Sequence, residues 1–222
     1  MENLNFTTAC FPPQIPKYFR EKADVLIFKK GQLVYQEGST PLGAYFVDKG
    51  KVKISKTGSL GKEKIVRIVK DTELLSFSDL FSRGRYSTTA ETLEESYLLF
   101  VSKEDFWEIL KTHHDIFSVL LFQLAQDISK IEETAADLAY KPVRGRLADA
   151  ILALDNDFNG KANSTHSIRL SRADLAGYIG TVKETVNRLL SELREEKIIF
   201  TSGSRIKIND IDKLTRISNL YR

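Results

Sequence analysis

Four polar side chains lie close together on one predicted helix and match the chemistry of DNA bases. They occupy positions i, i+1, i+4 and i+5 near the start of that helix, and so share one face: Lys183, Glu184, Asn187 and Arg188. Arg188 can donate two hydrogen bonds to guanine O6 and N7, and Glu184 can accept one from cytosine N4. Asn187 suits adenine N6 and N7 or a phosphate, whereas Lys183 offers a point charge. This set of four, called the polar quartet below, predicts a helix that contacts base edges in the major groove.

The residues around the polar quartet predict a helix-turn-helix over residues 171–198. Apolar side chains recur at helical spacing on both sides of the turn: Leu175, Ala176, Ile179, Val186, Leu189, Leu190 and Leu193. Gly180 lies where a tight turn between two helices needs a residue without Cβ strain, and Ala176 is small where the helices approach. The alternative is a solvated helix with ordinary charges. The agreement of glycine, small residue and polar quartet favours the DNA-binding interpretation.

Basic residues near this motif are expected to contact DNA phosphates. Two β-rich runs around Ser202-Gly203-Ser204 predict a hairpin, or wing, although it could serve only as a cover. The predicted phosphate contacts are Ser171, Arg172, Thr181, Thr185, Arg205 and Lys207. Residues 141–222 hold 15 Lys and Arg against 10 Asp and Glu, while residues 1–140 hold 18 against 20. Positive charge thus concentrates where a polyanion would bind.

The chain before this motif predicts a β-barrel or sandwich followed by helices. Short β-rich runs with glycines between them occur at 25–28, 33–35, 44–47, 51–54, 64–69 and 96–101. A helix is predicted from about Asp105 and a longer one after His114, ending near Tyr140. Pro142 marks a break, a further amphipathic helix opens at Arg146, and the polar stretch 155–167 is predicted to be a linker.

The long helix carries an apolar seam that predicts self-association. Its apolar residues are spaced alternately by four and three positions over three heptads: Phe117, Leu121, Leu124, Ile128, Ile131, Ala135 and Leu138. The alternative is a helix that packs only against its own barrel. The strict alternation favours a parallel or crossing homodimer.

Composition excludes several classes of protein. No apolar run approaches the about 20 residues of a membrane span, and the N-terminal residues lack the pattern of a secretory signal. The single cysteine, Cys10, excludes an intrachain disulfide and suits a reducing compartment, so a cytoplasmic location is expected. We expect no iron–sulfur cluster, because one cysteine cannot hold it.

The order of these pieces resembles that of the Crp/Fnr family of bacterial transcription regulators. The segments that carry the resemblance are Phe28–Gly38, Ala44–Val52, Val143–Ala148 and, most specifically, Leu170–Leu190. The resemblance implies an α+β fold: a cyclic-nucleotide-binding-type β-roll sensor (1–114), a dimerisation helix (115–140) and a winged helix-turn-helix (141–222). It also implies a non-enzymatic homodimer that binds a two-fold-symmetric site on double-stranded DNA, with RNA polymerase as a further partner. In the family's recognition helix, a basic residue, a Glu and a later Arg stand where Lys183, Glu184 and Arg188 stand here.

The barrel departs from the pattern of the cyclic-nucleotide-binding members. Their Gly-Glu pair, which meets the ribose, aligns with Ser76-Phe77, and their Arg-Ser pair, which meets the cyclic phosphate, aligns with Tyr86-Ser87. Phe77 cannot accept hydrogen bonds, and Tyr86 cannot neutralise a phosphate as arginine does. Cyclic AMP is therefore not expected, and the barrel senses an unidentified effector or none. In an alternative, cyclic-nucleotide-responsive version, Arg83 or Arg85 would hold the phosphate.

Two further classes of protein fit the sequence less well. A cupin-like metalloenzyme needs clustered histidines inside the barrel, but all three histidines, at 113, 114 and 166, lie outside it. Their positions also leave no haem ligand in the barrel, so no cofactor or metal is expected. An interaction module without DNA binding would leave the polar quartet unexplained.

Overall fold

The computed structural model describes residues 17–75, 77–82, 84–159 and 167–220. They form two compact units. One holds Val66–Glu132 together with the chain before Thr57, and the other holds Thr57–Ile65 together with Glu133–Arg222. One dividing point lies inside the long helix α4 (His114–Tyr140), next to Glu132.

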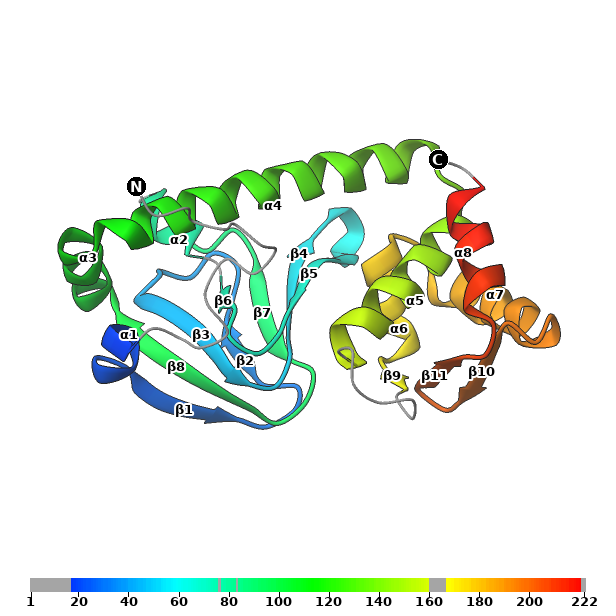
Figure 1. The fold of residues 1–222 in the computed structure, drawn as a ribbon, viewed down its shortest axis with the longest axis horizontal. Helices are drawn as coiled ribbons and strands as arrows, with labels where there is room; N and C mark the ends of the chain where they lie inside the picture. The colour runs from blue at the N-terminus through cyan, green and yellow to red at the C-terminus, as the bar shows by residue number, and fades with distance from the viewer. Residues whose placement is uncertain (1–16, 76, 83, 160–166, 221–222) are drawn as a thin grey trace. The chain divides into compact units, whose positions relative to one another are not determined.

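The first unit is built on two four-stranded sheets (Figure 1). The first has the order β1 (Asp24–Phe28), β8 (Ser96–Ser102), β3 (Gly43–Lys49) and β6 (Leu74–Leu75). The second has the order β2 (Leu33–Tyr35), β7 (Thr89–Thr92), β4 (Val52–Thr57) and β5 (Glu63–Val69), and the unit boundary crosses the end of β4 and the start of β5. β3 and β8 pair antiparallel from Gly43 opposite Ser102 to Lys49 opposite Tyr97. All six predicted β-rich runs lie in strands of these sheets, apart from Lys51, which precedes β4.

Two apolar cores hold the first unit together. One lies between the strands and includes Tyr35, Val47 and Leu98. The other packs short helices and the start of α4 against the first sheet: α1 (Lys17–Glu21), α2 (Ser78–Phe81) and α3 (Lys103–Thr112). Phe19, Phe46 and Phe106 are completely buried there. Burial of these rings, which removes large apolar surfaces from water, fixes the helices on the barrel.

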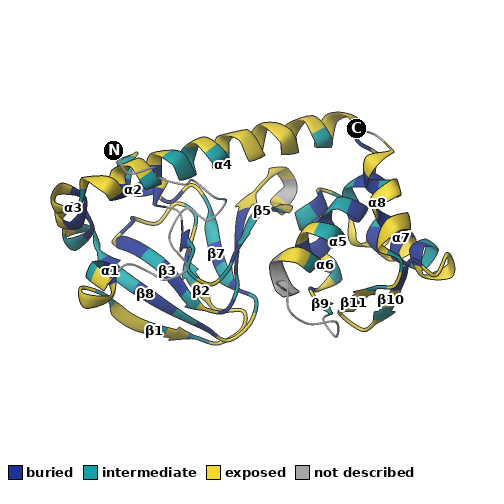
Figure 2. Cartoon of the chain, viewed as in Figure 1, coloured by how far each residue is buried: buried dark blue, intermediate teal, exposed yellow. Residues whose placement is uncertain are grey.

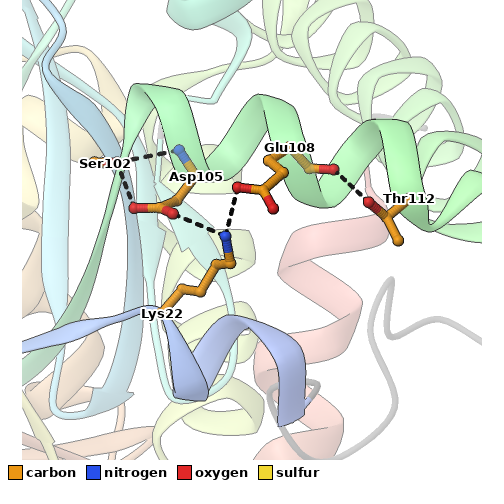
Figure 3. Close-up of polar contacts among 5 residues, drawn as sticks. All are labelled: Lys22, Ser102, Asp105, Glu108 and Thr112. Atoms are coloured by element: carbon orange, nitrogen blue, oxygen red, sulfur yellow. Dashed lines mark hydrogen bonds and ion pairs between the residues drawn. The ribbon is translucent and has the colours of Figure 1, made fainter.

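Helix α3 begins at Lys103, two residues before the predicted start near Asp105. Ser102 accepts a hydrogen bond from the Asp105 backbone N–H at 3.1 Å, which satisfies one of the unpaired donors of the first turn. Lys22 Nζ then joins Asp105 Oδ1 at 3.0 Å and Glu108 Oε2 at 2.6 Å, as Figure 3 shows. These contacts tie the chain between α1 and β1 to α3 at the surface of the unit.

The second unit combines helices with a small sheet. Its helices are α5 (Val143–Asn159), α6 (Arg172–Ile179), α7 (Lys183–Glu195) and α8 (Ile211–Asn219). Its sheet has the order β10 (Ile199–Ser202), β11 (Arg205–Ile208) and β9 (Ile168–Arg169). β10 and β11 form the predicted hairpin around Gly203. The predicted α+β fold, with its β-roll, long helix and winged helix-turn-helix, is confirmed.

The linker predicted over 155–167 is wrong in its first part. Helix α5 continues through Asp155 to Asn159, because Leu154 is buried on its inner face and no glycine or proline interrupts it before Gly160. Residues 160–166 lie outside the described part of the chain. No helix in the described ranges combines the length and the apolar character needed to cross a bilayer.

Candidate nucleic-acid interface and barrel interior

The helix-turn-helix is fixed by one cap and one glycine. Ser171 accepts a hydrogen bond from the Asp174 N–H at 3.0 Å and starts α6. Gly180 ends it with φ 72° and ψ 54°, a left-handed conformation that costs glycine little and other residues more. Two residues later Val182 leads into α7. The tight turn predicted from Gly180 is therefore present.

Helix α7 separates buried from exposed residues as the sequence predicts. Val186, Leu189, Leu190 and Leu193 are buried. The polar quartet lies on the opposite, exposed face, at the N-terminal end of the helix. In this position four side chains of different hydrogen-bonding type can reach the edges of neighbouring bases. Their contacts with DNA stay a prediction.

The predicted phosphate contacts differ in their surroundings. Arg205 and Lys207 are exposed on β11 beside the buried Ile206, and Thr181 and Thr185 are half-buried. Ser171 caps α6, as described above. Arg172 donates through Nη2 to the Gly203 carbonyl at 2.9 Å, and its half-buried position lowers its pKa. Arg172 thus joins the start of α6 to the turn of the wing.

Two cations that the sequence interpretation did not assign converge on the carbonyl end of α6. Arg146 donates to Ile179 O at 3.0 Å, to Gly180 O at 3.3 Å and to Lys141 O at 2.8 Å. Lys64 Nζ donates to the Tyr178 carbonyl oxygen. Both positive charges suit the negative end of a helix dipole. Burial, and then the charge of Arg146, lowers the pKa of Lys64 to about 8.

The apolar seam of α4 is exposed over most of its length (Figure 2). The exposed fractions reach 57% at Ile128 and 65% at Ile131. The barrel core is covered instead by Ile116 and Leu120, while Leu124 packs partly against it. Packing on the barrel therefore accounts for one side of α4 and leaves most of the seam exposed. Phe117, Leu121, Ala135 and Leu138 are exposed as well.

The residues aligned with the cyclic-nucleotide pocket are placed in different surroundings. Phe77 is 3% exposed and packs in the aromatic core with Phe81 at 6.2 Å between ring centroids. Tyr86 is 5% exposed and stacks on Tyr35 at 3.9 Å, with its hydroxyl donating to Gly43 O at 3.4 Å. Burial raises the pKa of Tyr86. Both side chains are core residues.

The other pocket candidates among the described residues lie at the surface. Arg85 is exposed and donates to Gly38 O at 2.8 Å, and exposed Ser87 accepts through its carbonyl from Lys56 Nζ at 2.7 Å. Ser76 and Arg83 lie outside the described residues. The described candidates are thus divided between core and surface.

A half-buried ion pair that the sequence did not indicate joins the barrel to α4. Arg67 on β5 contacts Asp127 at 3.0 Å and donates to Leu74 O at 2.8 Å. Gln123 Nε2 holds the same carboxylate at 2.8 Å. Arg67 and Asp127 are 60 residues apart in the sequence, so no local pattern could have found the pair. No group of three metal-ligating side chains occurs in the ranges that the structure describes.

Comparison with known proteins matches both units. A cyclic nucleotide-binding domain model matches residues 25–113, and a Crp-like helix-turn-helix domain model matches residues 145–217. A "CRP-like cAMP-activated global transcriptional regulator" of Mycobacterium tuberculosis is 26% identical over 85% of this chain and 85% of its own. A "Global nitrogen regulator" of Nostoc is 27% identical over 94% and 91%.

Solved structures agree at the level of the fold. FixK2 from Bradyrhizobium japonicum superposes with a TM-score of 0.77 at 22% identity, covering 88% of this chain and 96% of that one.

Proposed function

Because the chain belongs to the Crp/Fnr family of transcription regulators, we propose that it acts as a homodimer that binds DNA through α7 and regulates transcription. The observation that supports this proposal most directly is that α7 exposes the polar quartet on one face and buries its apolar residues on the opposite face. Arg188 contacts guanine, Glu184 contacts cytosine, and Asn187 contacts adenine or a phosphate. Arg205 and Lys207 on the wing contact the DNA backbone.

Two copies are needed for the proposed activity. The exposed seam of α4 supports pairing with a second α4, because an isolated helix face with this spacing buries its apolar side chains best in a coiled coil. A two-fold dimer places its two recognition helices about one helical turn of DNA, ~34–36 Å, apart. RNA polymerase in the cytoplasm is the further partner that we propose for the DNA-bound dimer.

The proposed regulator does not respond to cyclic AMP. The two relatives named above carry different names, one cAMP-activated and one a nitrogen regulator, at nearly equal identity. Their similarity therefore does not select an effector. The buried Phe77 and Tyr86 support an effector-independent barrel or one that binds another compound. Arg85 supports the cyclic-nucleotide alternative poorly, since it is exposed and already donates to Gly38 O.

Selection of bound sequences from a random DNA pool tests the main proposal. The expected result is a two-fold-symmetric site, with an affinity that falls steeply as salt rises because phosphate contacts release counterions. A single unpaired site, or no binding above background, would contradict the proposal.

A screen with nucleotides tests the effector part separately. Thermal unfolding and gel shifts with the selected site are measured with and without cyclic AMP, other cyclic nucleotides and common metabolites. Cyclic AMP is expected to change neither the melting temperature nor the DNA affinity. Constant DNA affinity with every compound supports the effector-independent version, and a response to cyclic AMP overturns our assignment.

A further inference from the structure

The guanidinium of Arg188 is held by a carboxylate on its own helix. Arg188 Nη1 donates to Glu192 Oε1 at 2.5 Å, one helical turn further along α7. The second oxygen of the same carboxylate, Glu192 Oε2, accepts from Arg144 Nη1 at 3.2 Å. Both oxygens of Glu192 are therefore engaged by arginines that come from different helices.

Arg144 is itself fixed by a second carboxylate. Its Nη2 lies 2.6 and 2.7 Å from the two oxygens of Glu196. The hydrogen bond to Glu196 is the main cause that raises the pKa of Arg144, with smaller contributions from Glu192. A chain of four alternating charges thus runs from the end of α7, through α5, to the proposed base-contacting face. Its members are Glu196, Arg144, Glu192 and Arg188.

A network of this kind holds a side chain better than one surface ion pair does. A lone exposed pair gains little, because two long side chains must lose rotamer freedom and water screens their charges. Here Arg144 is half-buried and held on two sides, so the Glu192 carboxylate has a defined position. The side chain of Glu192 is 34% exposed and that of Arg188 is 64% exposed. The inner end of the pair is sheltered, and the outer end reaches solvent.

We propose that Glu192 is a positioning residue that sets the orientation of Arg188 for a guanine, an inference that rests on the proposed DNA-binding function. A guanidinium has five N–H donors in one plane, and Glu192 uses one of them on Nη1. The remaining donors of Nη1 and Nη2 stay available for guanine O6 and N7. Fixing the plane of the guanidinium beforehand lowers the entropy that Arg188 loses on binding. Only a base that matches this orientation gains the resulting affinity.

The proposal separates specificity from affinity. Glu192 carries a negative charge close to the DNA-binding face, where it opposes phosphate binding. Its removal is therefore expected to leave non-specific affinity unchanged or raised while base discrimination falls. A residue that only supported the helix would lower both together.

Glu192→Gln in the full chain tests this, with Glu195→Gln as the matched control. Glu195 is exposed on the same helix, so its variant removes the same charge without touching the four-charge network. Binding is measured to the selected site, to the site with each substitution of the guanine pair, and to non-specific DNA. Glu192→Gln is expected to lose roughly three- to tenfold of the discrimination at that pair. Glu195→Gln is expected to keep it.

Equal discrimination in Glu192→Gln and Glu195→Gln would overturn the proposal. Arg144→Gln gives an independent test, because it releases Glu192 from outside α7 and should reduce the same discrimination. Melting temperatures of all variants identify any loss that comes from unfolding. Failure of the unchanged protein to bind any DNA would count against the proposed function, whereas normal binding with unaltered specificity in both variants would count against the positioning role alone.

Discussion

At the residue scale, charged side chains do structural work close to the proposed DNA contacts. The Arg146 guanidinium donates hydrogen bonds to the carbonyl oxygens of Ile179 and Gly180 at the turn between α6 and α7. It also donates to the carbonyl oxygen of Lys141, which follows α4. One guanidinium thereby joins the turn before α7 to the segment that precedes α5.

Replacement of Arg146 by Met is expected to lower the free energy of unfolding of the second unit by ~1.5–3 kcal/mol, because charged hydrogen bonds to half-buried carbonyls are lost. Chemical denaturation of the full chain measures this change. Arg194→Met is the control, since Arg194 is exposed on α7 and its side chain has no hydrogen bond among the described residues. Equal stability of the two variants would contradict the role given to Arg146.

Arg188→Ala is expected to cost ~1–3 kcal/mol at the selected site and to relax the preference at one base pair. Competition gel shifts with every base at that position measure both effects. If the variant weakened all sequences equally, Arg188 would contact a phosphate rather than a base.

At the element scale, α4 has one apolar side that packs on the barrel and another that is exposed. Ile116 and Leu120 close the barrel core, while the seam that includes Leu121 and Ile128 is exposed. An exposed apolar stripe of this length on a helix marks an interaction surface. Because Arg67 and Gln123 hold Asp127 on the same helix, a change in the barrel can act directly on α4.

Ile128→Glu is expected to dissociate the proposed dimer, because a charge would have to be buried in the seam. The side chain is already exposed in one copy, so the fold of that copy should remain intact. Sedimentation measures the change in mass, and Ser129→Glu, one position off the seam, supplies the matched control. A dimer that persisted in Ile128→Glu would place the interface elsewhere.

At the scale of the whole molecule, the two units are expected to respond differently to alkaline pH. In the first unit, burial and then Asp115 raise the pKa of Tyr18 to about 12, and burial raises those of Tyr45 and Tyr86. In the second unit, burial and Arg146 lower the pKa of Lys64 to about 8. Rising pH is therefore expected to lower the stability of the first unit through its tyrosines and to raise that of the second unit through Lys64.

For the tyrosines the stabilising contribution is complete below the usual value near 10 and is lost as pH rises toward 12, because only the unfolded chain ionises in that range. For Lys64 the unfolded chain binds the extra proton between about pH 8 and 10.5, so the stability of the second unit rises there. The first unit is expected to unfold earlier at alkaline pH.

Trp107 is the chain's one tryptophan, and its ring packs against Phe81 with 5.1 Å between the ring centroids. Its fluorescence therefore reports the unfolding of the first unit. Denaturation at pH 8 and above pH 10 should show a falling midpoint for this signal. Lys64→Met should remove the opposite trend of the second unit. A tryptophan midpoint that did not fall above pH 10 would contradict the assignment to the buried tyrosines.

The sequence by itself determined the features that depend on near neighbours along the chain. The turn at Gly180, the exposed quartet on α7 and the seam of α4 follow from helical periodicity and from one residue's backbone freedom, both of which act within a few positions. The β-rich runs were found for the same reason. Strand β7, with the sequence Thr89-Ala-Glu-Thr92, has no apolar alternation. The sequence pattern therefore did not predict it.

Only the tertiary structure decided which polar and aromatic residues meet across long stretches of chain. Tyr86 is a core residue because backbone hydrogen bonds to the loop after β2 bring its ring onto Tyr35, and Glu192 is held because α5 brings Arg144 to it. Such contacts depend on how whole elements pack, and no local spacing encodes them. The exposed polar face of α7 was therefore visible in the sequence, whereas the burial of Phe77 and Tyr86 and the ion pairs behind Arg188 became visible only in the folded chain.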